Sequence, residues 1–184
     1  MGARPAYVAA AHELGTALAR EGIRLVYGGG HVGLMGAVAD ACIEAGGEVH
    51  GVITESLRNA EIAHGSITRL EVVSDMHTRK ARMLEIADAF VAMPGGFGTL
   101  EELFEVVTWT QLGLHAKPLC LYDVAGFFAH LVEFTRHAGA EGFIKPVHLD
   151  LLTVAGSADE VLARLRSPLP ASTPKWVERV PPGV

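Results

Sequence analysis

The chain has 184 residues, of which 49% are hydrophobic and 20% are charged. This length suits one domain with a sizeable core, and the high apolar content excludes an intrinsically disordered chain. The formal net charge is −6, with 15 Lys and Arg residues scattered along the sequence. That argues against nucleic acid as the main partner, because phosphate backbones attract clustered cations.

Hydrophobic periodicity alternates between two kinds of element along the chain. Helical spacing of apolar residues predicts helices at residues 7–20, 34–45, 76–87, 100–112, 127–138 and 158–165. Short apolar runs predict strands at residues 23–27, 49–53, 70–73, 89–93, 118–122 and 151–154. Apolar strands between amphipathic helices are typical of a parallel sheet covered on both faces, so we expect a single α/β domain over residues 1–166. We expect a loop at residues 54–68 and an extended, proline-rich tail at residues 167–184.

Several classes of protein do not fit the sequence. Cys42 and Cys120 lie in apolar runs, which indicates buried reduced thiols. No apolar stretch reaches the roughly 18 residues of a membrane span, and no signal peptide precedes the first helix. The nine histidines lack zinc-site spacing, so no metal is expected. We therefore expect a cytoplasmic protein that binds neither membrane nor nucleic acid.

A glycine-rich segment at residues 94–102 follows one apolar strand and opens a helix. Glycine lets backbone amides approach an anion closely, and a helix N-terminus adds free N–H groups and the positive end of the dipole. The segment therefore predicts a phosphate site, with a tight turn that binds nothing as the alternative.

Two adjacent carboxylates, Glu101 and Glu102, end this segment. Carboxylates beside a phosphate site can position a ribose or activate water. Thr99 and Glu102 also fit a Thr-x-x-Glu capping box. In that case Glu101 would be the freer carboxylate to face a ligand.

Two further segments contain residues that could bind a ligand or act on it. Residues 28–36 are a second glycine-rich strand exit, and the pair of segments suggests two loops that flank one crevice. Residues 76–82 place three cations on one short helical stretch: Arg79, Lys80 and Arg82. These cations form either a solvated basic face or a site where Arg79 or Lys80 neutralises phosphate or transition-state charge.

Together these segments resemble the LOG ("Lonely Guy") family of cytokinin riboside 5′-monophosphate phosphoribohydrolases, often labelled lysine decarboxylase-like. The family signature Pro-Gly-Gly-x-Gly-Thr-x-x-Glu matches residues 94–102 at every fixed position. Met-His-x-Arg-Lys matches residues 76–80, and residues 26–36 and 108–113 are similar as well. The resemblance runs from about residue 5 to residue 165.

The resemblance implies a Rossmann-like doubly wound parallel sheet and a homodimer that needs no cofactor. Its substrate would be a nucleoside 5′-monophosphate, an N6-modified AMP, cleaved at the N-glycosidic bond to the free cytokinin base and ribose 5-phosphate. Arg79 with Glu101 or Glu102 would serve catalysis, in a reaction where carboxylates stabilise an oxocarbenium-like state and activate water. The positions implied to bind substrate are Gly29, Glu61, Lys80, Gly95, Gly96, Phe97, Gly98, Thr99 and Thr108.

One departure from the family pattern lies at the N-terminus. Family members usually begin with a strand and a Cys-Gly-Ser-Ser-like loop, whereas this sequence starts at what resembles the end of that loop. The start is thus either misassigned or the chain lacks its first strand. Without that strand, sheet edges and one wall of the nucleotide crevice would be exposed.

Two other functions compete with the hydrolase. A non-catalytic nucleotide or cofactor carrier on the same fold is one, and the retained carboxylates and Arg79 favour the enzyme over it. A lysine decarboxylase needs a Schiff-base lysine for pyridoxal phosphate. No lysine has a clear setting for that role: Lys80, Lys117, Lys145 and Lys175.

The helix expected at residues 100–112 is apolar around more than one face. Its apolar residues are Leu103, Phe104, Val106, Val107, Trp109 and Leu112. Such a helix is buried on several sides, either at a two-fold interface or inside a three-layer fold. We expect a homodimer.

Overall fold

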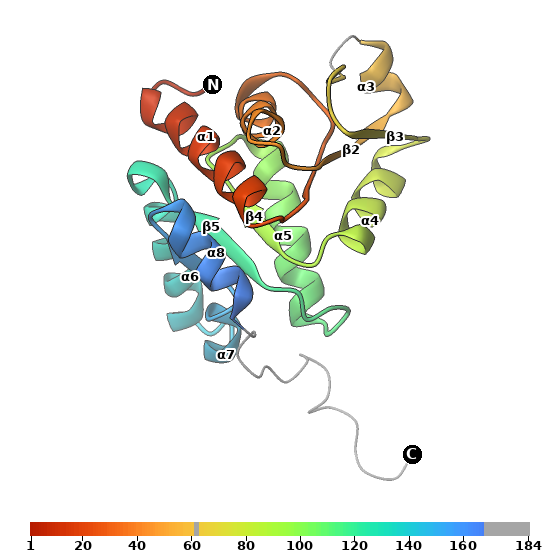
Figure 1. Cartoon of the computed structure of the whole chain (residues 1–184). Coiled ribbons are helices and arrows are strands. Elements are labelled where there is room, and N and C mark those ends of the chain that lie inside the picture. The colour runs from red at the N-terminus through yellow and green to blue at the C-terminus, as the bar shows by residue number, and fades with distance from the viewer. Residues whose placement is uncertain (61–62, 168–184) are drawn as a thin grey trace. The chain divides into compact units, whose positions relative to one another are not determined.

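The computed structural model describes residues 1–60 and 63–167 (Figure 1). The chain divides into two compact units, of which the first is Met1–Ala87 and the second begins at Asp88. Within the described residues, each unit has one three-stranded sheet in which neighbouring strands are parallel.

The first unit alternates helices and strands. Its elements in chain order are α1 (Pro5–Arg20), β1 (Leu25–Tyr27), α2 (Gly33–Glu44), β2 (Val49–Thr54), α3 (Glu55–Asn59), β3 (Arg69–Val73) and α4 (Met76–Ile86). The strand order is β1-β2-β3, and the central strand β2 is buried at all six positions. A strand buried along its whole length has both faces covered, as in other parallel α/β sheets. Part of the core is a cluster of Tyr27, Ala39, Cys42 and Val49.

The second unit repeats the pattern. Its elements are β4 (Phe90–Ala92), α5 (Phe97–Gln111), β5 (Leu119–Tyr122), a short 3₁₀ turn at Val124–Gly126, α6 (Ala129–Ala140), α7 (Pro146–Leu149), β6 (Thr153–Ala155) and α8 (Ala158–Arg166). The strand order is β4-β5-β6, and β5 is buried at all four positions. Its core cluster is Ala92, Leu103, Leu119, Leu121 and Phe128.

These elements confirm the predicted α/β class with parallel strands flanked by helices. The predicted strands and helices are all present, and no end is shifted by more than three residues. The prediction of a loop at residues 54–68 is wrong where α3 forms. The Thr54 hydroxyl accepts a hydrogen bond from the Leu57 N–H at 3.4 Å and so caps α3, which buries no residue and therefore leaves no apolar periodicity in the sequence.

The sequence also did not predict the helix α7, because a helix of four residues that begins at a proline, Pro146, is too short to show apolar periodicity. Cys42 and Cys120 are buried free thiols, as predicted, and burial raises the pKa of both. No helix within residues 1–60 and 63–167 is long and apolar enough to cross a membrane. The single domain over residues 1–166 stays a prediction, and residues 168–184 of the expected tail lie outside the described residues.

Candidate functional site

The glycine-rich turn after β4 leads directly into α5. Gly96 is the N-cap residue of α5, and no side chain caps the helix there. Gly95 leaves room for the Thr99 side chain, since a Cβ at Gly95 would overlap the Thr99 hydroxyl. The space beside Gly96 and Gly98 is open, with no heavy atom within 4 Å of a Cβ built there. The first amides of α5 therefore lie in an open turn at the positive end of the helix dipole, which suits an anion.

One face of α5 continues from this turn. Phe97, Glu101, Phe104 and Thr108 are all exposed and recur at helical spacing, which places them on a single face. Glu102 is half-buried. Glu101 is therefore the carboxylate that lies in the open, one turn from the glycines.

The Thr99–Glu102 capping box, which the sequence left open as an alternative, does not form, because Thr99 is not the N-cap of α5. The helix begins at Phe97, three residues earlier than expected, so Thr99 is already the third residue inside α5. The N-cap position belongs to Gly96, which has no side chain to accept a hydrogen bond. Glycine is tolerated at this position, and it leaves the helix terminus unblocked.

Arg79, another predicted site residue, lies on α4 of the first unit. Its side chain is 7% exposed, and its Nε–H donates to the Val52 carbonyl of β2 at 3.0 Å. The guanidinium lies against the glycine turn after β1, where a Cβ at Gly28 would overlap Arg79 Nη2. The solvated basic face is therefore ruled out for Arg79, which turns inward.

The other two cations of α4 have different surroundings. Lys80 is half-buried. The Arg82 Nε–H donates to Glu71 Oε1 at 2.8 Å, and Arg82 Nη1 donates to Glu85 Oε2 at 2.7 Å. Arg82 is thus an ion-pairing residue within the first unit.

The turn after β1 is fixed by its neighbours. Gly29 has φ +74°, the left-handed region that glycine adopts readily, and its carbonyl accepts the His64 N–H at 2.8 Å. His64 is buried, and its Nδ1 accepts the Ser66 N–H at 3.3 Å. Its Nε2 therefore carries the proton and donates to Asp40 Oδ1 at 2.9 Å. Sequence reasoning missed His64 and Asp40, since residues 24 positions apart give no local signal.

Asp75 was also missed, and it caps α4. Its carboxylate accepts from the Ser74 hydroxyl at 2.6 Å, from the Thr78 N–H at 2.9 Å and from the Thr78 hydroxyl at 2.8 Å. These donors hold the pKa of Asp75 well below its usual range. An Asp just before a helical pattern is the signal that would have located this N-cap.

The predicted site residues thus fall into two sets. Gly29, Arg79 and Lys80 belong to the first unit, and residues 95–99, Glu101, Glu102 and Thr108 belong to the second. Glu61 lies outside the described residues. The single crevice flanked by both glycine turns stays a prediction. The described part of the chain contains no group of three or more His, Cys, Asp or Glu side chains placed to bind a metal.

Comparison with known proteins gives matches over most of the chain. The family model described as "Possible lysine decarboxylase" matches residues 35–165. A cytokinin riboside 5′-monophosphate phosphoribohydrolase of Rhodococcoides fascians is 48% identical over 159 residues, which cover 86% of this chain and 80% of that protein. A protein of the same activity name from Arabidopsis thaliana is 44% identical over 180 residues, covering 95% and 84% of the two chains.

Solved structures give the same fold at lower identity. The molybdenum cofactor binding protein of Rippkaea orientalis superposes with a TM-score of 0.66 and 21% identity, covering 88% of this chain and 86% of that one. An identity this low supports the shared fold, a Rossmann-like α/β arrangement, and nothing about the ligand.

Proposed function

This chain belongs to the LOG family, described as possible lysine decarboxylases, and we propose that it hydrolyses the N-glycosidic bond of an N6-modified adenosine 5′-monophosphate. The products are the free cytokinin base and ribose 5-phosphate. Identity of 44–48% to relatives named for this reaction supports the assignment. The structural observation that carries it is the open glycine turn at the start of α5, with Glu101 exposed one turn later.

The roles of the residues follow from their chemistry. We propose that the amides of residues 95–99 hold the 5′-phosphate, because an uncapped helix N-terminus presents several N–H donors to an anion. Glu101 then stabilises positive charge on the ribose and accepts a proton from water as the water oxygen bonds to C1′. The C1′–N9 bond breaks in the same process, and the departing base takes up a proton.

Arg79 supplies the positive charge in this scheme. We propose that its guanidinium neutralises phosphate or transition-state charge, and that Gly29, Lys80 and Thr108 contact the nucleotide. A buried cation acts more strongly than an exposed one, since water screens it less. Glu102, half-buried beside Glu101, is the second candidate carboxylate.

The test is an assay for product with defined substrates. The protein is incubated with N6-isopentenyladenosine 5′-monophosphate, and free base and ribose 5-phosphate are quantified. Glu101→Gln is expected to lower kcat about a hundredfold or more, the scale of losing an acid–base group. Glu133→Gln on α6 is the matched control, since its side chain is 81% exposed and lies outside both glycine turns. Nucleotide binding without release of base would instead indicate a carrier, and cadaverine formed from lysine would indicate a decarboxylase.

We also propose a homodimer. Leu103, Val106 and Val107 of α5 pack into the core of the second unit, which accounts for part of the apolar surface of this helix. Phe97 and Phe104 remain 92% and 40% exposed, and a two-fold interface is the commonest way to cover such side chains. Light scattering at micromolar concentration should give twice the chain mass. The cytoplasmic location stays a prediction, to be checked by fractionation.

A further inference from the structure

The helix α4 has no fully buried apolar side chain. Its whole length is described, and Arg79 is its only buried residue. The apolar side chains of its second half, Met83, Leu84 and Ile86, are half-buried. A helix without a buried apolar stripe depends on polar contacts for its exact position on a sheet.

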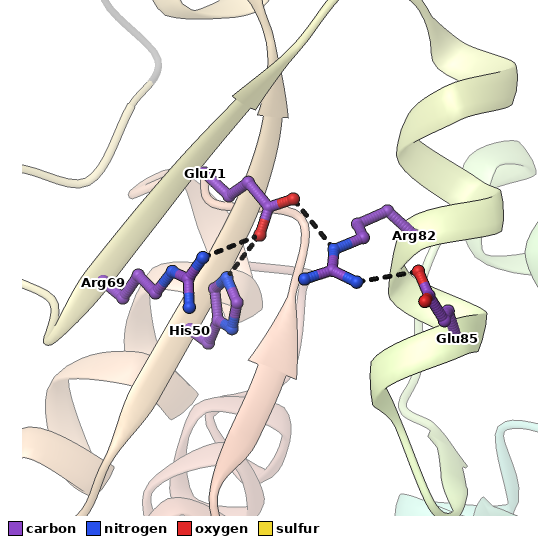
Figure 2. A network of polar contacts seen from close by, with 5 residues as sticks. All are labelled: His50, Arg69, Glu71, Arg82 and Glu85. Atoms are coloured by element: carbon purple, nitrogen blue, oxygen red, sulfur yellow. Dashed lines mark hydrogen bonds and ion pairs between the residues drawn. The ribbon is translucent and has the colours of Figure 1, made fainter.

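A network of charged side chains supplies such contacts (Figure 2). Glu71 of β3 lies at its centre and uses both carboxylate oxygens. Glu71 Oε2 accepts from His50 Nε2 of β2 at 3.2 Å and from Arg69 Nη2 at 3.4 Å. Glu71 Oε1 accepts from Arg82 Nε of α4 at 2.8 Å, and Arg82 in turn binds Glu85. One carboxylate thereby joins two strands and one helix.

The network is partly shielded from water. The side chains of His50, Glu71 and Arg82 are 5%, 22% and 30% exposed. Burial and the neighbouring charge of Arg69 lower the pKa of His50, so it is neutral at pH 7 and donates its Nε2 proton to Glu71. Hydrogen bonds that involve an ionised partner are shorter and stronger than neutral ones, and partial burial limits their screening.

Two of the polar contacts of α4 reach adjacent points on the sheet. Arg79 donates to the carbonyl of Val52, and Val52 is the ladder partner of Glu71, which binds Arg82. Arg79 and Arg82 are three residues apart, so they lie on neighbouring turns of the same helix face. A shift of α4 that breaks one contact therefore also moves the other.

We propose that Glu71 and Arg82 are positioning residues for Arg79, and that their ion pair sets where α4 lies on β2 and β3 and hence where the guanidinium lies against Gly28. The inference rests on the proposed function, because it assigns a task to Arg79 of that site. A small displacement of a charged catalytic group lowers the reaction rate steeply, because catalysis depends on the position of that group. Neither residue needs to touch the substrate.

The first test uses a matched pair of substitutions at the same carboxylate. Arg82→Gln removes the cation that comes from α4, whereas Arg69→Gln removes one that comes from β3 itself. Arg82→Gln is expected to lower kcat about tenfold with KM within about twofold, and Arg82→Lys should restore most of the loss. Arg69→Gln should leave both constants within about twofold of wild type, the small effect usual for an exposed ion pair. Equal kcat for Arg82→Gln and wild type would overturn the inference.

The second test asks whether Arg82 acts through Arg79. In an Arg79→Ala background, measured by single turnover with excess enzyme, adding Arg82→Gln should lower the rate no further. Independent, multiplicative losses would overturn the positioning role. Wild-type turnover by Arg79→Ala alone would instead refute the proposed function of Arg79, which keeps the two failures distinct.

A spectroscopic readout needs no turnover. The Nε–H of Arg79 is hydrogen-bonded to Val52 and buried, so its NMR signal should be protected from exchange in the wild type and in Arg69→Gln. Arg82→Gln and the second variant Glu71→Gln should both speed that exchange at least tenfold. Unchanged protection in a folded Glu71→Gln protein would contradict the inference even if Arg82→Gln failed to fold.

Discussion

The two glycine turns follow strands in the same way but differ in what fills the space beside them. In the turn after β1, the chain itself takes up the room: Arg79 occupies the position of a side chain at Gly28, and a Cβ at Gly29 would lie 3.0 Å from the Leu70 side chain. At the start of α5, Thr99 fills the space beside Gly95, whereas a Cβ at Gly96 or Gly98 would meet nothing within 4 Å outside the neighbouring backbone. The first turn is packed, and the second is open beside Gly96 and Gly98.

This contrast assigns different tasks to the same residue type. Glycine in the first turn gives an arginine a fixed, buried place, so the charge is oriented before any ligand arrives. Glycine in the second turn leaves backbone amides accessible to an anion. We infer that the turn after β1 fixes the position of Arg79 and that the turn at the start of α5 binds the phosphate. The predictions below test these two roles separately.

The largest expected effect concerns the open turn. N6-isopentenyladenosine 5′-monophosphate should exceed the riboside in kcat/KM by about three orders of magnitude or more, roughly 4 kcal/mol, because several charge-assisted hydrogen bonds to the phosphate are lost together. Di- and triphosphates should also be poor substrates, because the few free N–H groups of one helix N-terminus suit a single phosphate. Initial rates for the four forms at equal concentration measure this preference. Equal rates for riboside and monophosphate would mean that the turn is only structural.

The packed turn is tested by Gly28→Ala. The added methyl overlaps Arg79 Nη2, the far end of a flexible side chain, so the guanidinium moves while the fold tolerates the change. We expect kcat to fall about a hundredfold, the scale of losing a group that stabilises charge, with a small change in Tm. Gly65→Ala is the matched control in the same unit, because its Cβ meets nothing within 4 Å. Equal turnover of the two variants would show that the placement of Arg79 is unimportant.

The sequence predicted both turns but not the difference between them. Glycine at a strand exit gives the same pattern whether its missing side chain makes room for Arg79 or for a ligand. The buried orientation of the Arg79 side chain depends on its hydrogen bond to the Val52 carbonyl, 27 residues away in the sequence. The spacing of charged residues within one helix cannot predict such a contact. The start of α5 was misjudged for a related reason: Thr-x-x-Glu at residues 99–102 imitates a cap, whereas the helix begins at Phe97 without one. Apolar periodicity, by contrast, located the strands, because burial of β2 and β5 is continuous.

A smaller effect on rate is expected for Gly98→Ala in the open turn. Gly98 lies inside the first turn of α5, where alanine favours the helix by about 1 kcal/mol, and nothing in the described structure opposes the added methyl. Tm should stay equal or rise. With the phosphate bound at these amides as proposed, the methyl would stand beside it, so kcat/KM for the monophosphate should fall about tenfold. A rise in Tm with unchanged kcat/KM would place the phosphate elsewhere.

The smallest effect concerns acid stability of the network around Glu71. The hydrogen bond from Arg82, more than any other contact, lowers the pKa of Glu71 from its usual 4.5 against the opposing effect of burial, and the charges of Arg82, of Arg69 and of His50 once it is protonated act in the same direction as the hydrogen bond. A carboxylate with a lowered pKa stabilises the fold above about pH 4.5, and that stabilisation is lost as the pH falls through the lowered value.

His50 also makes the fold less stable as the pH falls, but in a higher pH range than Glu71. Burial, then the charges of Arg69 and Arg24, lower its pKa from 6.5, against the opposing effect of Glu71. The unfolded chain therefore binds a proton at His50 more readily than the folded one, and stability decreases as the pH falls below about 6.5.

Tm measured from pH 7 to pH 3.5 should decline for the wild type twice, first below about pH 6.5 because of His50 and again below about pH 4.5 because of Glu71. In Arg82→Gln the decline below pH 4.5 should be shallower, because Glu71 has lost the contact that lowers its pKa most, and its carboxyl ¹³C titration should move toward 4.5. Parallel Tm curves for the two proteins would mean that Arg82 does not hold Glu71 in solution, and the link from α4 to the packed turn would then rest on the Arg79 hydrogen bond to Val52.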